Sequence, residues 1–192
     1  MRTQLLRDKT RHIVDFAAKI FIYIGIPPNV ISSFNILLII AFFPLLKNGH
    51  FYSGGLIILL SGFFDVVDGA VAKAAGKSTT FGIFVDRTLD KISDGAFLAA
   101  YMLYGLINIP LGVYTLVVIF LATNVSANIE SVLHLKVSNA VSFRFFRIII
   151  LSVFTILQQF MAMFIILAIL STYSLVHRLV IAFRYSRKDG TK

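Results

Sequence analysis

Six stretches of this chain are apolar over roughly 18 to 25 residues, the length that a helix needs to cross the hydrocarbon core of a bilayer. Of its 192 residues, 58% are hydrophobic and only 14% are charged, which is too apolar for a soluble domain of this size. We therefore predict an all-α integral membrane protein with six transmembrane helices. The expected spans lie near residues 30–48, 52–75, 80–106, 109–134, 145–162 and 163–183.

Residues 1–26 differ from the six apolar stretches. Lys and Arg are interleaved there with Leu, Ile and Phe at helical spacing, which is typical of an amphipathic helix lying in the headgroup plane. The chain contains no Cys, so thiol and disulfide chemistry are excluded. We find no repeat or long linker and predict one domain over residues 1–192, which begins with this interfacial helix.

The basic residues predict how the spans are oriented. If the N-terminus is cytoplasmic, every Lys and Arg except Lys47 lies at or near the cytoplasmic face, as the positive-inside rule requires. The result is a multi-pass protein of the cell membrane. Topology and attraction to anionic lipid account for the net charge of +9, and we expect no nucleic-acid partner.

Two of the apolar stretches contain acids, at Asp65, Asp68, Asp86 and Asp90. A charged side chain at the bilayer centre costs at least about 2.5 kcal/mol, and carboxylates on facing helices repel one another. They therefore need a cation between them. The alternative is a structural one, in which ion pairs with Lys73, Arg87 or Lys91 only fix the helix register.

The spacing of the acids predicts where they meet. In an antiparallel hairpin, Asp68 and Asp86 lie at the same depth, and Asp65 and Asp90 pair one turn deeper. On each helix the acids recur every three or four residues and so share one face. We expect both faces to converge, with the small residues of 69–74 letting the two helices pack tightly. Such an oxygen-rich site suits Mg²⁺ or Mn²⁺, and we expect two ions.

Eight positions keep fixed gaps across these two spans: Asp65, Asp68, Gly69, Ala72, Lys73, Gly82, Asp86 and Asp90. Their spacing resembles the signature of the CDP-alcohol phosphotransferases, integral membrane enzymes that make phospholipid headgroups. Lys73 stands where this family usually carries Arg. The residues 28–32 also resemble the family's entry to the first span. The resemblance implies a six-helix fold, a homodimer and a polar cavity that opens to the cytoplasm.

The resemblance also implies a reaction, in which a hydroxyl of a polar alcohol attacks the lipid-attached phosphorus of a CDP-lipid and CMP is released. By motif position, Asp65, Asp68, Asp86 and Asp90 hold the metal ions, and Asp90 is also the general base. The positions implied to line the CDP-lipid site are Asn29, Ser32, Gly69, Lys73, Thr79 and Gly82. Ordinary helix capping explains the hydroxyl and amide residues of that set equally well.

Basic residues after the fourth span suggest the acceptor. Lys136, Arg144 and Arg147 lie on the cytoplasmic side, and the two arginines share one helical face. Such a group suits an anion, although anchoring at the membrane surface explains it equally well. Lys91 and Asp94 resemble the branch that makes phosphatidylinositol phosphate or its archaeal ether-lipid counterpart. We expect inositol phosphate as acceptor, with glycerol 3-phosphate or serine as alternatives.

Two other classes of protein stay open. A cation transporter also uses intramembrane acids, although this chain shows no inverted repeat or paired helix interruptions. A lipid-binding protein that kept the fold without the activity is the second, suggested by Lys73. Metal-dependent release of CMP from a CDP-lipid would separate an enzyme from both.

Overall fold

The computed structural model describes residues 19–24, 28–74, 80–133 and 140–189. Within these ranges it contains helices and no strand. The helices after residue 24 are α2 (Pro28–Lys47), α3 (Phe51–Ala74), α4 (Thr80–Leu103), α5 (Ile109–Val132), α6 (Ala140–Ile156) and α7 (Phe160–Asp189). For five helical residues singled out above, the structure does not describe the side chain: Asn29, Ser32, Ala72, Lys73 and Asp86. Thr79 and Lys136 lie wholly outside it, as do residues 1–18 of the expected interfacial helix.

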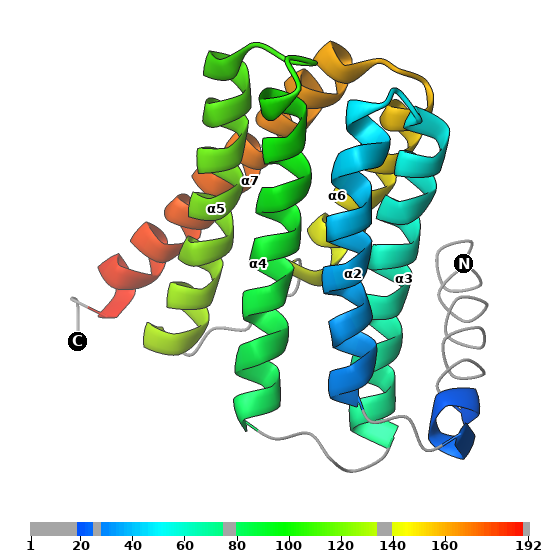
Figure 1. Cartoon of the computed structure of the whole chain (residues 1–192). Coiled ribbons are helices and arrows are strands. Elements are labelled where there is room, and N and C mark those ends of the chain that lie inside the picture. The colour runs from blue at the N-terminus through cyan, green and yellow to red at the C-terminus, as the bar shows by residue number, and fades with distance from the viewer. Residues whose placement is uncertain (1–18, 25–27, 75–79, 134–139, 190–192) are drawn as a thin grey trace, which may run out of the picture.

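The helices run up and down as one bundle (Figure 1). At one end, called the turn end here, short connections join α2 to α3, α4 to α5 and α6 to α7. Each of them contains one residue with a left-handed backbone, Gly49, Gly105 or Gln158, at φ of 74°, 67° and 57°. At the opposite end, called the site end, α3 stops and α4 begins.

The helix order and four of the six positions agree closely with the sequence prediction, but the split between the last two helices was placed wrongly. We expected it at 162–163, and it lies at 157–159. Gln158 reverses the chain there in a left-handed conformation that a non-Gly residue seldom adopts. An ordinary turn signal is therefore missing from the sequence. The helix α6 consequently covers 140–156, and α7 runs from 160 to 189.

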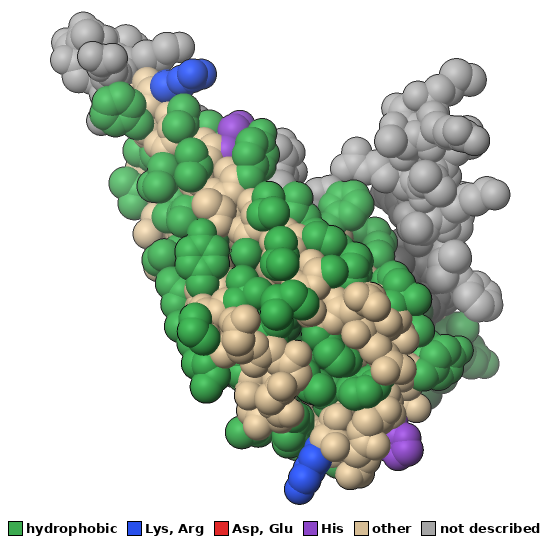
Figure 2. All heavy atoms as spheres, turned by 90° about the horizontal axis from the view of Figure 1, so that it is seen from above, with side chains coloured by type: hydrophobic (Ala, Val, Ile, Leu, Met, Phe, Trp, Pro, Cys, Tyr) green, Lys and Arg blue, Asp and Glu red, His purple; other side chains and the backbone are tan. Residues whose placement is uncertain are grey.

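Three of the described helices are long and apolar enough to cross a membrane: Phe51–Val71 in α3, Ile109–Val132 in α5 and Phe160–Tyr185 in α7. A shorter apolar segment, Phe34–Lys47, forms most of α2. Seen from the turn end, the surface is mostly hydrophobic, and Lys and Arg lie near its margin (Figure 2). These features point to a membrane protein.

The packing of α3 and α4 differs from the expected tight hairpin. The helix α3 packs on α2 and α6, and α4 packs on α2 and α5, whereas in the described residues α3 and α4 hardly touch each other. Close approach occurs elsewhere, because Gly55 and Gly62 of α3 lie directly against α6. The prediction that residues 69–74 bring α3 against α4 was therefore wrong. Instead, α2 packs on both acidic helices in the described residues, and α6 packs on α3.

The main hydrophobic core lies toward the turn end. Phe42, Phe97, Tyr101 and Phe164 are almost completely buried there and come from three different helices. A second, smaller cluster near the site end joins Phe21, from helical residues 19–24, to Phe64 and Val67 of α3. The bundle is thus anchored by apolar packing at the turn end, which leaves the acidic residues of α3 and α4 in its more polar half.

Candidate active site

The acids of α3 and α4 meet at an arginine from α6. The Nη1 atom of Arg144 donates a hydrogen bond to Asp65 and lies 2.6 Å from a carboxylate oxygen of Asp90. All three side chains are between 16% and 25% exposed. Because one nitrogen contacts both carboxylates, Asp65 and Asp90 face each other across the gap between α3 and α4, as the spacing predicted.

A second ion pair, between α6 and α4, lies one helical turn further along α4. The guanidinium of Arg147 donates to Asp94, and the Nε atom of Arg144 lies 3.9 Å from the same carboxylate. Asp94 is only 7% exposed. We refer to Asp65, Asp90 and Asp94 with Arg144 and Arg147 as the ionic cluster. Ion pairing of intramembrane acids does occur, and among the described side chains Arg144 and Arg147 of α6 are partners. Arg87, one of the partners considered from the sequence, is exposed.

Asp68 lies three residues after Asp65 on α3 and is 5% exposed. One turn separates the two, so both carboxylates belong to the face of α3 that looks toward the ionic cluster. Asp86 lies one turn before Asp90 on α4, where helical periodicity puts it on the acidic face. Two of the four expected metal ligands, Asp65 and Asp90, are thus brought together directly.

The donor chemistry of this site fits a hard divalent cation. Carboxylate oxygens from two helices already surround one cationic nitrogen, and oxygen ligands are those that Mg²⁺ and Mn²⁺ prefer. Among the described side chains, however, no group of three or more His, Cys, Asp or Glu is close enough together to hold a metal ion. Asp86, whose side chain is not described, is the expected additional ligand, together with Asp68.

Gly69 faces open space at the site end. A Cβ atom built there would meet nothing within 4 Å, so packing within the protein does not require a glycine at this position. Gly82 is half-buried in the first turn of α4. These two glycines are the described members of the expected CDP-lipid site. The space beside Gly69 is available to a ligand that approaches the backbone of α3.

One candidate functional residue was not identified from the sequence. Arg178 of α7 is 5% exposed, and its Nη1 donates a 2.5 Å hydrogen bond to the carbonyl oxygen of Ala122 on α5. It lies within electrostatic range of Arg147 and of Glu130. A buried cation inside a long apolar helix is uncommon unless it has a function, and that was the available signal. With Arg144 and Arg147 it brings a third arginine to this part of the bundle.

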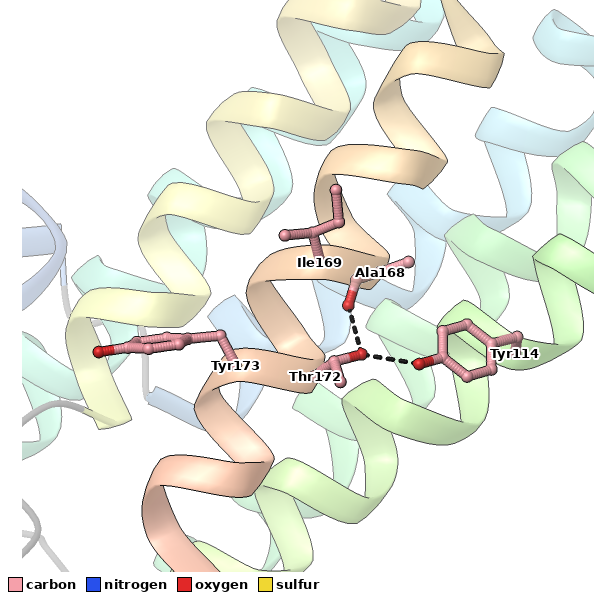
Figure 3. Close-up of a pocket in the computed structure, with 5 residues that line it drawn as sticks. All are labelled: Tyr114, Ala168, Ile169, Thr172 and Tyr173. Atoms are coloured by element: carbon pink, nitrogen blue, oxygen red, sulfur yellow. Dashed lines mark hydrogen bonds between the residues drawn. The ribbon is translucent and has the colours of Figure 1, made fainter.

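A shallow pocket lies away from the ionic cluster, between α5 and α7 (Figure 3). The Tyr114 hydroxyl lies 2.9 Å from Thr172 Oγ1, which itself donates to the carbonyl oxygen of Ala168 at 2.7 Å. Since the threonine proton is used in that bond, Tyr114 is the donor to Thr172. Tyr173 points to the other side of α7 in this view. The pair joins two apolar helices by a polar contact and offers no acid, base or nucleophile of ordinary reactivity.

Comparison with solved structures shows that the fold is a known one. The phosphatidylinositol phosphate synthase of Mycobacterium tuberculosis with CDP-DAG bound superposes with a TM-score of 0.68, covering 88% of this chain and 92% of that one at 22% identity. The same synthase in complex with manganese and citrate gives a TM-score of 0.66, over 86% and 87% of the two chains, also at 22% identity. At this level of identity the comparison establishes a shared fold.

Curated relatives extend the similarity to sequence. The archaetidylinositol phosphate synthase of Methanothermobacter thermautotrophicus is 33% identical over 139 residues, which cover 69% of this chain and 71% of that protein. That of Pyrococcus horikoshii is 32% identical over 117 residues, 58% and 60% of the two chains. The phosphatidylinositol phosphate synthase of Mycobacteroides abscessus is 33% identical over 96 residues. That match covers 50% of this chain and 44% of the relative, so the similar region spans less than two thirds of the latter two proteins.

The model of the CDP-alcohol phosphatidyltransferase family matches residues 26–184. This region contains all the helices α2 to α6 and most of α7, and with them the whole ionic cluster. The chain therefore belongs to the CDP-alcohol phosphatidyltransferase family.

Proposed function

We propose that this protein transfers a phosphatidyl or archaetidyl group from a CDP-lipid to inositol phosphate and releases CMP. Family membership supports the reaction type, and the relatives named above are synthases of phosphatidylinositol phosphate or archaetidylinositol phosphate. Both phosphatidyl and archaetidyl products occur among these relatives, so either lipid core is compatible with the proposal.

The meeting of acids and arginines at one site supports this function most directly. Transfer between two phosphorylated substrates requires a place for metal ions and a place for a second anion. Carboxylates of α3 and α4 offer the first, and guanidinium groups of α6 offer the second. The two are adjacent, as they must be if the acceptor hydroxyl is to reach the phosphorus.

Asp65, Asp68, Asp86 and Asp90 are the residues that would hold the divalent ions. When bound, such ions would screen the diphosphate and stabilise charge on the departing CMP. In the transfer, the acceptor oxygen forms a bond to the lipid-attached phosphorus as the bond from that phosphorus to the CMP oxygen breaks. The Asp90 carboxylate takes up the hydroxyl proton.

The nucleotide side of the site would lie over the site end of α3 and α4. Open space beside Gly69 permits the CDP group to approach the backbone, and Gly82 has the equivalent position in the first turn of α4. Lys73 would supply a positive charge to the diphosphate, with a single ammonium in place of the two-pronged guanidinium of Arg. Asn29, Ser32 and Thr79 complete the proposed set.

The phosphate of the acceptor would bind among basic residues of α6 and α7. Arg144 and Arg147 already lie at the acids, and the buried Arg178 lies near Arg147. Lys136, in the connection before α6, is the fourth proposed member. Serine carries a carboxylate and an ammonium group and would bring no net negative charge to this group of cations, which favours a phosphorylated acceptor in an apolar environment.

The proposed topology has six spans, with the site end facing the cytoplasm. Besides α3, α5 and α7, the proposed spans are α2, α4 and α6, which are shorter or carry the charges of the site. Polar residues in membrane-spanning helices face the bundle interior. The positive-inside distribution of Lys and Arg supports the orientation. We also propose one domain with residues 1–26 at the membrane surface, and a homodimer as the active form.

Release of CMP tests the function. Purified protein in detergent is incubated with Mg²⁺ or Mn²⁺ and a CDP-lipid of ester or ether type, together with inositol phosphate, glycerol 3-phosphate or serine in separate reactions. We expect CMP and the phosphodiester product with inositol phosphate alone. Product with glycerol 3-phosphate or serine instead would reassign the acceptor, and no CMP with any acceptor would refute the enzymatic function.

A further inference from the structure

Arg144 contacts the same carboxylates that would hold the metal ions. Its Nη1 atom donates a hydrogen bond to Asp65 and lies 2.6 Å from an oxygen of Asp90. Both acids lie on the helix faces that are expected to carry the metal ligands. The guanidinium therefore joins α3 to α4, two helices that hardly touch each other directly in the described residues. It balances part of the negative charge of this site in the same place where an ion would do so.

A divalent ion and this guanidinium cannot bind these oxygens together without strong repulsion. Ligand distances of about 2.1 Å for Mg²⁺ would put the ion within about 5 Å of Nη1. Two like charges at so short a distance repel each other strongly in a site that is largely shielded from water. The Arg144 side chain must therefore leave Asp65 and Asp90 when the ion binds.

We propose that Arg144 closes the metal site by competing with the divalent ion for Asp65 and Asp90. Displacement by the ion frees the guanidinium on α6, one turn from Arg147, where it can bind the phosphate of the acceptor. Entry of the metal thus exposes Asp90 and assembles the anion site in one step. This inference rests on the proposed metal site and adds an order of events to it.

The competition predicts a tighter metal site when the arginine is removed. The apparent affinity for the ion is reduced by the fraction of molecules in which Arg144 occupies the carboxylates. If that fraction is about nine tenths, Arg144→Gln lowers the dissociation constant for Mn²⁺ about tenfold. The variant would bind metal better while losing activity with the acceptor, a combination that a simple metal ligand or a simple acceptor contact does not produce.

Arg147→Gln is the matched control. It removes the same charge from the same helix one turn away, but its partner is Asp94. We expect its dissociation constant for Mn²⁺ to change by less than about threefold. The repulsion between a bound ion and a guanidinium one turn away is weaker than direct competition for the same carboxylates. An equal increase in Mn²⁺ affinity in both variants would show that net charge alone sets the affinity, and would overturn the proposal.

The experiment measures Mn²⁺ binding to purified protein by the electron paramagnetic resonance signal of free Mn²⁺, without substrates. Wild type, Arg144→Gln, Arg147→Gln and Asp68→Asn are compared. Tighter binding only in Arg144→Gln is the expected result, and unchanged or weaker binding in that variant overturns the competition. If Arg144→Gln is unstable alone, Mn²⁺ should restore its thermal stability, since the ion replaces the guanidinium; failure to restore it also counts against the proposal.

The same preparations separate this inference from the proposed function. Loss of Mn²⁺ binding in Asp68→Asn together with CMP release by the wild type supports the metal site, whatever Arg144→Gln does. In that case, an unchanged Mn²⁺ affinity of Arg144→Gln would refute only the competition between Arg144 and the ion, and the metal site would stand. Absence of both Mn²⁺ binding and CMP release in the wild type would remove the proposed function itself.

Discussion

Two glycines of α3 should respond in opposite ways to the same substitution. A Cβ at Gly55 would lie 2.5 Å from Cγ1 of Ile156 and 2.8 Å from the carbonyl oxygen of Ser152, both on α6. A Cβ at Gly69 would meet nothing within 4 Å. Gly55→Ala therefore forces α3 and α6 apart, whereas Gly69→Ala only fills space beside the proposed CDP site.

The magnitudes follow from these contacts. Overpacking costs about 1–3 kcal/mol, and replacing Gly by Ala in a helix interior recovers about 1 kcal/mol. We expect Gly55→Ala to be destabilised on balance, with a thermal midpoint lowered by about 2–4 °C for each kcal/mol. Gly69→Ala should be as stable as wild type or slightly more stable. Its kcat/KM should fall about tenfold to a hundredfold, because a methyl group displaces the diphosphate from its reactive position.

The assay pairs thermal stability with CMP release. The chain contains no Trp, so stability is followed by size-exclusion chromatography of the folded fraction after heating in detergent. A fully active Gly69→Ala would refute the use of this space by the substrate. An unchanged midpoint in Gly55→Ala would refute the close packing of α3 on α6.

Three further substitutions test individual site residues. Asp68→Asn should abolish CMP release but leave a folded, extractable protein, because a metal ligand matters more to chemistry than to packing; full activity would remove Asp68 from the metal site. Lys73→Arg should retain activity, since the positive charge is kept, and loss of CMP release would mean a different diphosphate contact. Arg178→Lys should raise KM for inositol phosphate about tenfold with little change in KM for the CDP-lipid, and equal changes in both would make its role structural.

Much of the fold could be predicted because hydrophobic length is a local property. Each apolar stretch is long enough to span a bilayer by itself, so helices α2 to α5 lie close to the expected positions. The boundary at Gln158 could not be predicted, since the left-handed backbone there falls on a glutamine and not on one of the usual turn-forming residues.

The candidate site shows the same division. Periodicity along a helix determines which side chains share a face, and so the acids of α3 and α4 could be placed opposite each other from their spacing alone. Periodicity within a helix carries no information about which other helix lies beside that face. Arg144 and Arg147 were therefore expected only at the acceptor, and their contacts with Asp65, Asp90 and Asp94 were missed.

The sequence by itself determined the helices, the acidic faces and the resemblance to a family, because each depends on spacing along the chain. The tertiary structure alone decided that α2 packs on both α3 and α4, and that arginines of α6 contact the acids of both helices. It also decided that Gly55 and not residues 69–74 sets a close helix contact, and that Arg178 is buried. These depend on contacts between residues far apart in the chain, where many pairings satisfy the same local pattern. Packing selects one of them by burying apolar surface while keeping buried charges paired.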